Sequence, residues 1–432
     1  MQPRALSTEL PGLVGQQVFL QGWVHRIRDF GGVRFVILRD RTGFAQVVVP
    51  ANINIDAIGC EWTVSVTGCC RAETRAPAGV EVLADNVSPI SPAETPPLEV
   101  FSPSAAEKNR METLLDHRAI SLRIPDVLDV FRVQGVVLDA FRTYLREQGF
   151  MEIVTPKLAL AGAEGGSAVF RVEYYEGTAY LAQSPQFYKQ IMVGSGIERV
   201  FESGHAYRAE KSETSRHLTE YLSLDFEMGF IESEQDVMRM HTGLVRAIFE
   251  AVKQHCGPII QRRGVAIPKV GEIPQVSFPR AKQVLHDRFG KTSGIDGDLD
   301  TEGERLICQW AQEELGSELL FITGYHVGNR PAYIMPDQDE PPLTRSFDLL
   351  FRGVEITTGG QRIHDYRQLV DSFRSRGLNP SAYEGYLECF KHGMCPHGGM
   401  GMGIERLIMQ MLSLSNIKKA CLFPRDRNRL LP

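Results

Sequence analysis

Residues 201–210 read Phe-Glu-Ser-Gly-His-Ala-Tyr-Arg-Ala-Glu, and residues 220–230 read Glu-Tyr-Leu-Ser-Leu-Asp-Phe-Glu-Met-Gly-Phe. Both stretches are largely apolar and β-prone, and a short charged segment separates them. The pattern predicts a long hairpin in which Arg208 and Glu210 lie at the end of the first strand. Because guanidinium groups on rigid strands hold phosphate oxygens through paired hydrogen bonds, such a hairpin suits a triphosphate. An exposed hairpin that carries only solvated charges is the alternative.

A second informative segment lies near the end of the chain. Residues 401–406 read Gly-Met-Gly-Ile-Glu-Arg, and the apolar residues 407–412 follow. This predicts a glycine-rich turn that leads into a helix, with Arg406 in its first turns. Alone, such a turn is a weak signal for phosphate binding, and an ordinary helix start is the alternative.

Upstream of the hairpin, apolar residues recur at helical spacing from residue 127, and the run ends at Gly149. Residues 150–156 follow as a β-prone segment that closes with proline. We therefore expect a helix followed by a short strand.

Acidic residues mark a fourth segment. Asp348 and Glu355 lie on β-like stretches, and Thr358 follows shortly after. Carboxylates near phosphates suit Mg²⁺, which prefers oxygen ligands. The sequence therefore predicts a magnesium ion held between these residues and a nucleotide.

Together these segments resemble the class II aminoacyl-tRNA synthetases, and they occur in the order of that family's motifs. Residues 127–156 resemble motif 1, the dimer-forming helix and strand, residues 201–230 resemble motif 2, and residues 401–412 resemble motif 3. The resemblance implies an α+β catalytic domain with an antiparallel sheet flanked by helices. It also implies a homodimer, ATP as a substrate and Mg²⁺ as the metal ion.

The amino-terminal part of the chain has a different pattern. Five short strand candidates separated by turns predict a small OB-type barrel, a fold that binds oligonucleotides on its sheet face. These candidates are residues 18–24, 33–38, 45–49, 63–67 and 80–83.

Within this barrel, residues 22–46 resemble the anticodon-binding domain of aspartyl-, asparaginyl- and lysyl-tRNA synthetases. The resemblance implies that Phe35 stacks on a base, that Gln46 binds its edge, and that Arg26 or Arg28 contacts phosphate or base. The alternative for Phe35 is a place in the barrel core, because Val33, Phe35 and Ile37 share one strand face. A proline-rich linker follows the barrel.

We expect three parts. Residues 1–100 form an OB-fold anticodon-binding domain, residues 101–122 a hinge, and residues 123–432 the class II catalytic domain.

The segment Ser184-Pro-Gln-Phe-Tyr-Lys189 resembles the aspartyl and asparaginyl members, and Arg362 stands where the aspartyl version binds the side-chain carboxylate. Arg362 and Lys189 together should present excess positive charge and favour aspartate over asparagine. An ordinary salt bridge with nearby acids is the alternative. Glu164 lies in a glycine-rich loop that resembles the family's closing loop. The resemblance implies aspartate-binding residues Glu164, Ser184, Gln186, Lys189, Arg208, Asp225, Thr358 and Arg362.

The resemblance also implies a nucleotide site, in which arginines neutralise the phosphates of ATP. The implied ATP-binding residues are Arg208, Glu210, Arg216, His217, Leu218, Glu355, Gly403 and Arg406. The implied metal-binding residues are Glu355, Thr358 and Asp348.

At 432 residues the chain leaves no room for the large insertion that marks the usual bacterial aspartyl enzymes, so it resembles their short archaeal/eukaryotic type. That type activates L-aspartate with ATP and transfers it to tRNA(Asp). His25 and Pro77 stand where some relatives enforce the third anticodon base, and proline offers no side-chain donor. We expect a non-discriminating enzyme that also charges tRNA(Asn) and leaves the amidation of Asp-tRNA(Asn) to a partner amidotransferase. The alternative is that His25 and Pro77 are turn residues with no role in the choice of tRNA.

The composition agrees with a cytoplasmic enzyme. The net charge is −6, so local basic clusters rather than a general basic field must bind nucleic acid. The sequence has no apolar run near 18 residues and no signal segment, and we expect no membrane association. The eight cysteines are scattered, which favours reduced thiols.

Two other function classes stay open. One is an asparaginyl-tRNA synthetase or a tRNA-independent amide-forming relative, and the other is an inactive paralogue that only binds RNA. The asparaginyl enzyme is disfavoured by Arg362 and Lys189, and the tRNA-independent relative is disfavoured by the complete barrel. An inactive paralogue is disfavoured by the intact motif residues Arg208, Glu355 and Arg406.

Overall fold

The computed structural model describes residues 3–102, 104–160, 168–209, 214–292 and 298–431. The chain divides into two compact units, Met1–Pro125 and Asp126–Pro432. The expected boundaries of the three parts, at residues 100 and 122, stay a prediction.

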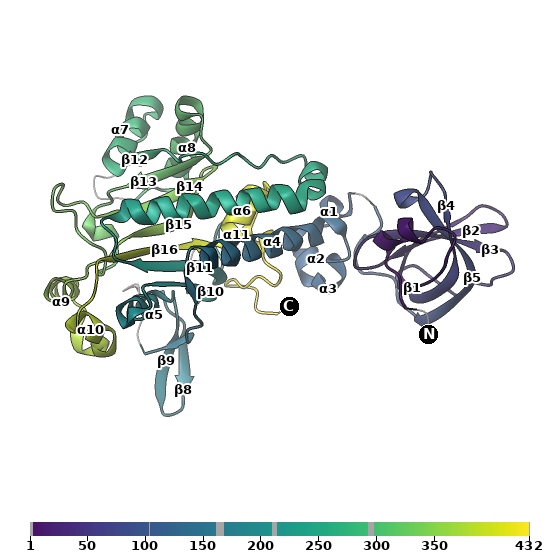
Figure 1. Cartoon of the computed structure of the whole chain (residues 1–432), viewed down its shortest axis with the longest axis horizontal. Coiled ribbons are helices and arrows are strands. Elements are labelled where there is room, and N and C mark those ends of the chain that lie inside the picture. The colour runs from purple at the N-terminus through teal and green to yellow at the C-terminus, as the bar shows by residue number, and fades with distance from the viewer. Residues whose placement is uncertain (1–2, 103, 161–167, 210–213, 293–297, 432) are drawn as a thin grey trace. The chain divides into compact units, whose positions relative to one another are not determined.

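The first unit contains a closed barrel of five strands in the order β1-β2-β3-β5-β4 (Figure 1). β3 and β5 pair in parallel, and the other neighbours are antiparallel. Alternate residues point inward, as in β4, where every second residue from Val64 to Cys70 is buried. The predicted OB-type barrel is confirmed. Its strands are β1 (Gln17–Asp29), β2 (Val33–Arg39), β3 (Phe44–Pro50), β4 (Thr63–Ala72) and β5 (Val80–Ser91).

Short helices accompany the barrel. They are the 3-10 helices η1 (Ser7–Leu13) and η2 (Pro77–Gly79) and the α-helices α1 (Ala105–Lys108), α2 (Met111–Asp116) and α3 (Arg118–Ser121).

The barrel core excludes Phe35. Val36 and Leu38 of β2 are buried in the core cluster, whereas Val33 is 39% exposed and Phe35 is half-buried. Because side chains alternate along a strand, the face that carries Phe35 points outward. The core alternative for Phe35 is therefore wrong.

The second unit is built on an eight-stranded sheet in the order β12-β13-β14-β15-β16-β11-β10-β6. Only the edge pairs β12–β13 and β10–β6 are parallel. The predicted hairpin is confirmed as β10 and β11, and the predicted α+β architecture is confirmed. The strands are β6 (Met151–Glu152), β10 (Arg199–Tyr207), β11 (Glu220–Gly229), β12 (Gln275–Ser277), β13 (Leu319–Thr323), β14 (Ser346–Phe351), β15 (Val354–Gln361) and β16 (His397–Gly403).

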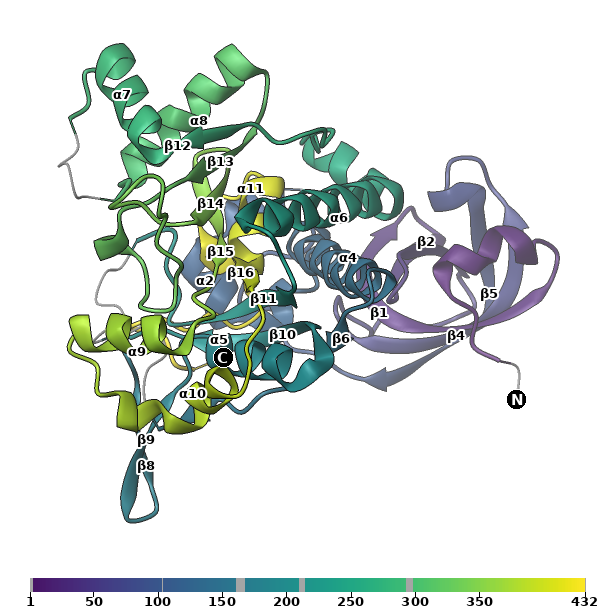
Figure 2. The ribbon, with the colours of Figure 1, turned by 60° about the vertical axis from the view of Figure 1, so that its left-hand side comes forward.

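A small separate sheet, in the order β7-β9-β8, projects as a hairpin (Figures 1 and 2). Its strands are β7 (Leu158–Ala159), β8 (Arg171–Tyr174) and β9 (Gly177–Leu181).

Helices flank the large sheet. None of those in the described ranges combines the length and the apolar character needed to cross a membrane. The helices are α4 (Pro125–Glu147), α5 (Gln186–Met192), α6 (Glu234–Arg263), α7 (Phe278–Phe289), α8 (Thr301–Leu315), α9 (Tyr366–Ser375), α10 (Glu384–Lys391) and α11 (Ile404–Met411). Short helical turns lie at η3 (Val193–Ile197), η4 (Val327–Asn329), η5 (Pro380–Tyr383) and η6 (Ile417–Ala420).

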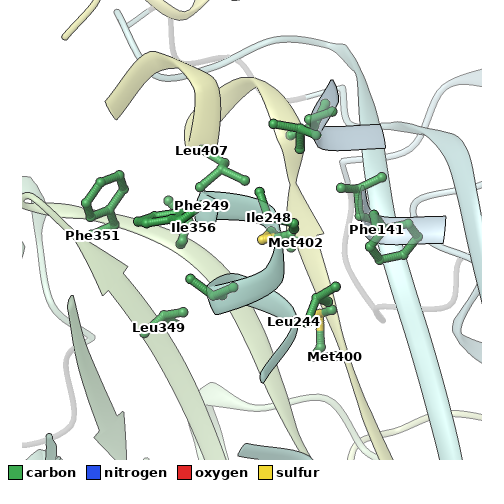
Figure 3. Packing of buried hydrophobic residues seen from close by; sticks show 14 of the residues in the cluster. Phe141, Leu244, Ile248, Phe249, Leu349, Phe351, Ile356, Met400, Met402 and Leu407 are labelled. Atoms are coloured by element: carbon green, nitrogen blue, oxygen red, sulfur yellow. The ribbon is translucent and has the colours of Figure 1, made fainter. Parts of the chain in front are cut away.

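The main core lies between one face of the sheet and the helices α4, α6 and α11 (Figure 3). Phe141 of α4, Phe249 of α6 and Leu407 of α11 are fully buried against apolar strand residues. The predicted helix of residues 127–149 is α4, which ends at Glu147.

Strand β16 separates this core from the opposite face of the sheet. Its residues Met400 and Met402 are fully buried in the core, while Gly399 and Gly401 alternate with them and face the other way. Gly401 and Gly403 were expected in a turn, and that expectation is wrong, because β16 is hydrogen-bonded to both β15 and β11. From Gly399 to Gly403 this face of the strand therefore carries no side chains.

The close packing at Gly399 can be tested. A Cβ at this position would lie 2.1 Å from the carbonyl oxygen of Phe226 and 2.2 Å from Glu227 Oε2. We expect Gly399→Ala to lower the free energy of unfolding by about 3 kcal/mol, because a backbone neighbour cannot move aside. Urea unfolding measures this, with Gly385→Ala as the control. A Cβ at Gly385 of α10 meets nothing within 4 Å, so that change should be neutral or stabilising by up to about 1 kcal/mol. Equal effects of the two substitutions would contradict the predicted clash.

Candidate active site

A cavity of about 630 Å³ opens on the glycine face of the large sheet. Strands β11, β15 and β16 form its floor, and the segments around residues 184, 216 and 330 form its walls. Among the residues predicted for aspartate, ATP and metal binding, those that line the cavity are Ser184, Gln186, Arg208, Arg216, His217, Leu218, Asp225, Glu355, Thr358, Arg362, Gly403 and Arg406.

Four of the predicted residues are not in this lining. Lys189 is 1% exposed and lies behind Asp225, and Asp348 is buried next to Arg330. The remaining two, Glu164 and Glu210, lie outside the described residues.

Two residues of the cavity lining, Asp225 and Arg362, belong to a cluster of four buried charges whose other members are Lys189 and Glu227. Lys189 Nζ is 2.8 Å from Asp225 Oδ1 and 3.5 Å from Glu227 Oε2. Arg362 Nε donates to Glu227 Oε1 at 2.8 Å, and Gln186 Oε1 accepts from Arg362 Nη2 at 3.3 Å. Asp225 and Glu227 reach the same face because they are two residues apart on β11.

The sequence led us to expect a pocket with two unbalanced cations, Arg362 and Lys189, and that expectation is wrong. Glu227 was missed, although a second acid at period two on a buried strand is a signal that could have revealed it. Burial raises the pKa of the Glu227 carboxyl, but Arg362 and Lys189 outweigh this and hold it below its usual value. Two cations and two carboxylates balance each other before a ligand binds.

Asp225 has an oxygen suited to an incoming cation. Its Oδ2 is buried and accepts no hydrogen bond from any residue in the described ranges, while Oδ1 is bound to Lys189. A buried acceptor without a donor is destabilising unless a ligand supplies one. An ammonium group fits this requirement.

A chain of neutral hydrogen bonds supports the cluster from behind. Gln190 Nε2 lies 2.8 Å from His397 Nε2, Tyr386 Oη donates to Gln190 Oε1 at 3.0 Å, and His397 Nδ1 lies 2.8 Å from the carbonyl oxygen of Cys395. Burial lowers the pKa of His397 to about 4, so its imidazole is neutral at pH 7. Neutral His397 then donates through Nδ1 and accepts through Nε2.

The lining of the cavity also includes the predicted arginines Arg208, Arg216 and Arg406. Arg406 Nη1 donates to the carbonyl oxygen of Glu355 at 2.9 Å and lies 3.4 Å from its Oε1. The Arg208 guanidinium lies 5.8 Å from the ring centre of Tyr221. Arg216 Nη1 pairs with Glu304, on α8, at 2.9 Å. Arginine groups gathered around a cavity can hold phosphates.

Oxygen donors near these arginines fit a hard divalent cation. Thr358 Oγ1 donates to Glu355 Oε1 at 3.1 Å, and Asp348 is the register partner of Thr358 on β14. Asp348 Oδ2 pairs with Arg330 at 2.6 Å, whereas its buried Oδ1 has no partner among the described residues. Carboxylate and hydroxyl oxygens are ligands that Mg²⁺ accepts. The described residues contain no group of three His, Cys, Asp or Glu side chains that could hold a metal.

Asp348 remains a carboxylate at neutral pH. Burial raises its pKa to about 6, and the neighbouring Glu355 adds to this, while Arg330 opposes it. The ion pair with Arg330 keeps this residue in place on β14.

In the first unit, the predicted anticodon-binding residues lie on three adjacent strands. Arg28 is opposite Phe35 in the β1–β2 register, and Ile37 is opposite both Arg26 and Gln46. Since side chains alternate along strands, this register places all four predicted residues on one outer face.

Local contacts fix several of these side chains. Phe35 meets the 70% exposed Phe30 edge-on, with ring centres 5.7 Å apart. Gln46 Nε2 donates to Glu81 Oε2 at 2.8 Å, and Arg26 Nη2 donates to the carbonyl oxygen of Phe101 at 3.3 Å. Exposed aromatic rings beside cations suit single-stranded bases.

The two residues predicted to govern tRNA choice differ in exposure. His25 is half-buried, with its ring centre 4.9 Å from that of Phe44 and 5.7 Å from that of Phe101. Burial lowers its pKa, and its Nδ1 has no partner among the described residues. Pro77 is exposed at the start of η2.

Comparison with known proteins gives consistent matches. Residues 110–427 match the family described as tRNA synthetases class II (D, K and N), and residues 18–90 match the OB-fold nucleic acid binding domain. The chain is 46% identical to an aspartate–tRNA(Asp/Asn) ligase of Deinococcus radiodurans, over 99% of each chain. It is 41% identical to an aspartate–tRNA(Asp) ligase of Thermococcus kodakarensis, over 97% of each chain. The asparaginyl-tRNA synthetase of Pyrococcus horikoshii with asparaginyl-adenylate superposes with a TM-score of 0.94 at 30% identity, over the full length of both chains.

The neutral state of His397 leads to a pH prediction. Unfolded histidine binds a proton below pH 6.5, whereas folded His397 does not until about pH 4. Between these values His397 lowers stability as pH falls, with a slope of up to about 1.4 kcal/mol per pH unit. We expect the unfolding free energy of His397→Gln to fall less steeply than that of the wild type between pH 6 and 4.5, by up to that amount, with His286→Gln on exposed α7 as the control. Identical slopes for wild type and His397→Gln would show that His397 takes up a proton in the folded state.

Proposed function

Because this chain belongs to the class II tRNA synthetases of the D, K and N group, we propose that it is a non-discriminating aspartate–tRNA ligase. It activates L-aspartate with ATP and transfers the aspartyl group to tRNA(Asp) and tRNA(Asn). The buried cluster of Lys189, Arg362, Asp225 and Glu227 is the observation that carries the proposal. A discriminating aspartyl enzyme and an asparaginyl enzyme are the alternatives.

The cluster offers each charged group of aspartate a partner. Asp225 Oδ2 receives the α-ammonium, and Arg362 with Lys189 receives the side-chain carboxylate. Adding a carboxylate to a balanced cluster of two cations and two acids is favourable only if the ammonium is bound at the same time. The site therefore suits an amino acid that carries an ammonium group, an α-carboxylate and a second carboxylate on its side chain. An asparagine side chain would leave the Arg362 fork with a weaker, neutral acceptor.

The first reaction step is an in-line displacement. The α-carboxylate oxygen of aspartate bonds to the α-phosphorus of ATP as the bond to the bridging oxygen breaks, which gives aspartyl-adenylate and pyrophosphate. Arg208 neutralises the α-phosphate, Arg216 and His217 bind the distal phosphates, and Arg406 binds the γ-phosphate. Glu210 and Leu218 position the adenine. No covalent enzyme intermediate is needed.

Glu355, Thr358 and Asp348 are the residues that would hold Mg²⁺. When bound, the ion offsets negative charge on the phosphates. Glu164 is a further residue that binds aspartate. Ser184 and Gln186 face its α-groups.

Transfer requires tRNA on both units. The outer barrel face with Arg26, Arg28, Phe35 and Gln46 binds the anticodon. The enzyme acts as a homodimer, and the exposed Met151 of edge strand β6 supports an interface there. Since tRNA charging takes place in the cytoplasm and the cysteines are free, we place the protein there.

The choice of amino acid can be measured by ATP–pyrophosphate exchange. Aspartate should support exchange, and asparagine should be weaker by at least about 100-fold in kcat/KM. Arg362→Lys retains the charge but loses the fork, so we expect kcat/KM for aspartate to fall about 100-fold. Arg367→Lys, on the exposed side of α9, is the matched control and should leave exchange unchanged. Exchange driven by asparagine alone would establish the asparaginyl alternative.

The choice of tRNA requires purified tRNA(Asp) and tRNA(Asn). Their anticodons differ only in the third base, and neither Pro77 nor the half-buried His25 presents a long cationic side chain at the surface. We expect both tRNAs to be aspartylated, with kcat/KM values within about 100-fold of each other. Pro77→Lys should lower charging of tRNA(Asn) more than that of tRNA(Asp). Discrimination above about 1000-fold, or about 4 kcal/mol, by the wild type would refute relaxed recognition. Asp-tRNA(Asn) made in this way needs an amidotransferase as the next enzyme.

A further inference from the structure

Glu304 lies on α8, outside all the segments that resemble family motifs, and it contacts Arg216 and Glu355, two residues that line the cavity. Its Oε2 accepts a hydrogen bond from Arg216 Nη1 at 2.9 Å and another from the backbone N–H of Glu355 at 3.2 Å. The side chains of Arg216 and Glu304 are only 17% and 15% exposed. One carboxylate oxygen thus joins a loop arginine to the strand that carries Glu355.

A second fixed partner holds the same arginine. Arg216 Nη2 donates to the carbonyl oxygen of Gly353, in the turn between β14 and β15. Arg352 and Gly353 have positive φ angles of 48° and 82°, and a Cβ at Gly353 would lie 3.1 Å from the Cα of Arg305. The turn therefore lies tightly against α8. The guanidinium is positioned by α8 and this turn, in addition to its own loop.

The charges around Glu304 also favour a positioned cation. Glu304 lies beside the Glu355 carboxylate, and Arg216 and Arg406 supply the opposing charges. A guanidinium has five N–H donors, so one that is held through two of them can still present others to phosphate oxygens. A cation that is already ordered loses less side-chain entropy when its ligand binds.

We propose that Glu304 is a positioning residue that holds Arg216 in place for the distal phosphates of ATP. The inference rests on the proposed function, because it takes ATP as the ligand of this cavity. An ion pair with only a structural role would lower stability when removed, without a selective change in the response to ATP.

The test measures aspartate-dependent ATP–pyrophosphate exchange with Glu304→Ala, Glu304→Gln and the control Glu302→Gln. Glu302 lies two residues earlier on α8, its side chain is 63% exposed, and it pairs with Lys291. Its substitution removes the same charge without touching Arg216. We expect Glu304→Ala to raise the KM for ATP about tenfold while the KM for aspartate stays within about twofold. Glu304→Gln retains an acceptor without the charge and should raise the KM for ATP about threefold, while the control should stay within about twofold. If the alanine variant does not fold, the glutamine variant gives the readout.

A double-mutant cycle identifies the route of the effect. Arg216→Ala alone should raise the KM for ATP at least as much as Glu304→Ala does. In the Arg216→Ala background, adding Glu304→Ala should change this KM by less than about twofold, because the side chain through which Glu304 acts is gone. The proposal is overturned if both Glu304 variants match the control, or if Glu304→Ala keeps its full effect without Arg216. If the wild-type chain shows no exchange with aspartate or asparagine, the proposed function fails, and this inference fails with it.

Discussion

The pairing of Asp225 and Glu227 with Lys189 and Arg362 is the interaction on which the site depends. These four side chains are each at least 96% buried. Taking one such charge out of water costs several kcal/mol, so any of them alone would be strongly destabilising. Their mutual balance keeps Arg362 in the cavity lining and Lys189 behind it, and Asp225 Oδ2, which is buried and accepts no hydrogen bond from a described residue, leaves one place where a ligand cation is needed.

The backbone of β16 makes room for this arrangement. Met400 and Met402 fill the core on one face, and the glycines that alternate with them leave the other face bare. The Asp225 and Glu227 side chains lie across these glycines, since Cβ atoms at Gly401 and Gly399 would lie 3.0 Å and 2.2 Å from their carboxylate oxygens. The same strand therefore supports both the core and the site. A larger residue on the bare face would disturb both.

Much of the fold could be predicted from local pattern. The β10–β11 hairpin, helix α4 and the barrel strands follow from periodicity, because each is a regular element with one apolar face. Gly401 and Gly403 of β16 were expected in a turn, since glycine signals turns locally and only pairing with β15 and β11 makes this segment a strand. Most of the predicted site residues line the cavity, because they were assigned from the resemblance to family motifs and not from local pattern.

The missing residues are those whose partners lie far away in sequence. Glu227 pairs with Arg362, 135 residues later, and Glu304 pairs with Arg216, 88 residues earlier. The period-two spacing of Asp225 and Glu227 marks a second buried acid, but no local spacing shows which cation it pairs with. The charge of the pocket was misjudged for this reason, because the cations were recognised by motif and one of their acids was not.

The most direct test of the central claim is a crystal structure of the protein with a nonhydrolysable aspartyl-adenylate analogue. We predict that the ligand's side-chain carboxylate lies on Arg362 and Lys189, and that its ammonium group donates to Asp225 Oδ2. The adenosine end should then lie at Arg208 and Leu218. A ligand bound elsewhere, or one whose carboxylate avoids Arg362 while the four buried charges keep only one another as partners, would contradict the claim that this cluster recognises aspartate.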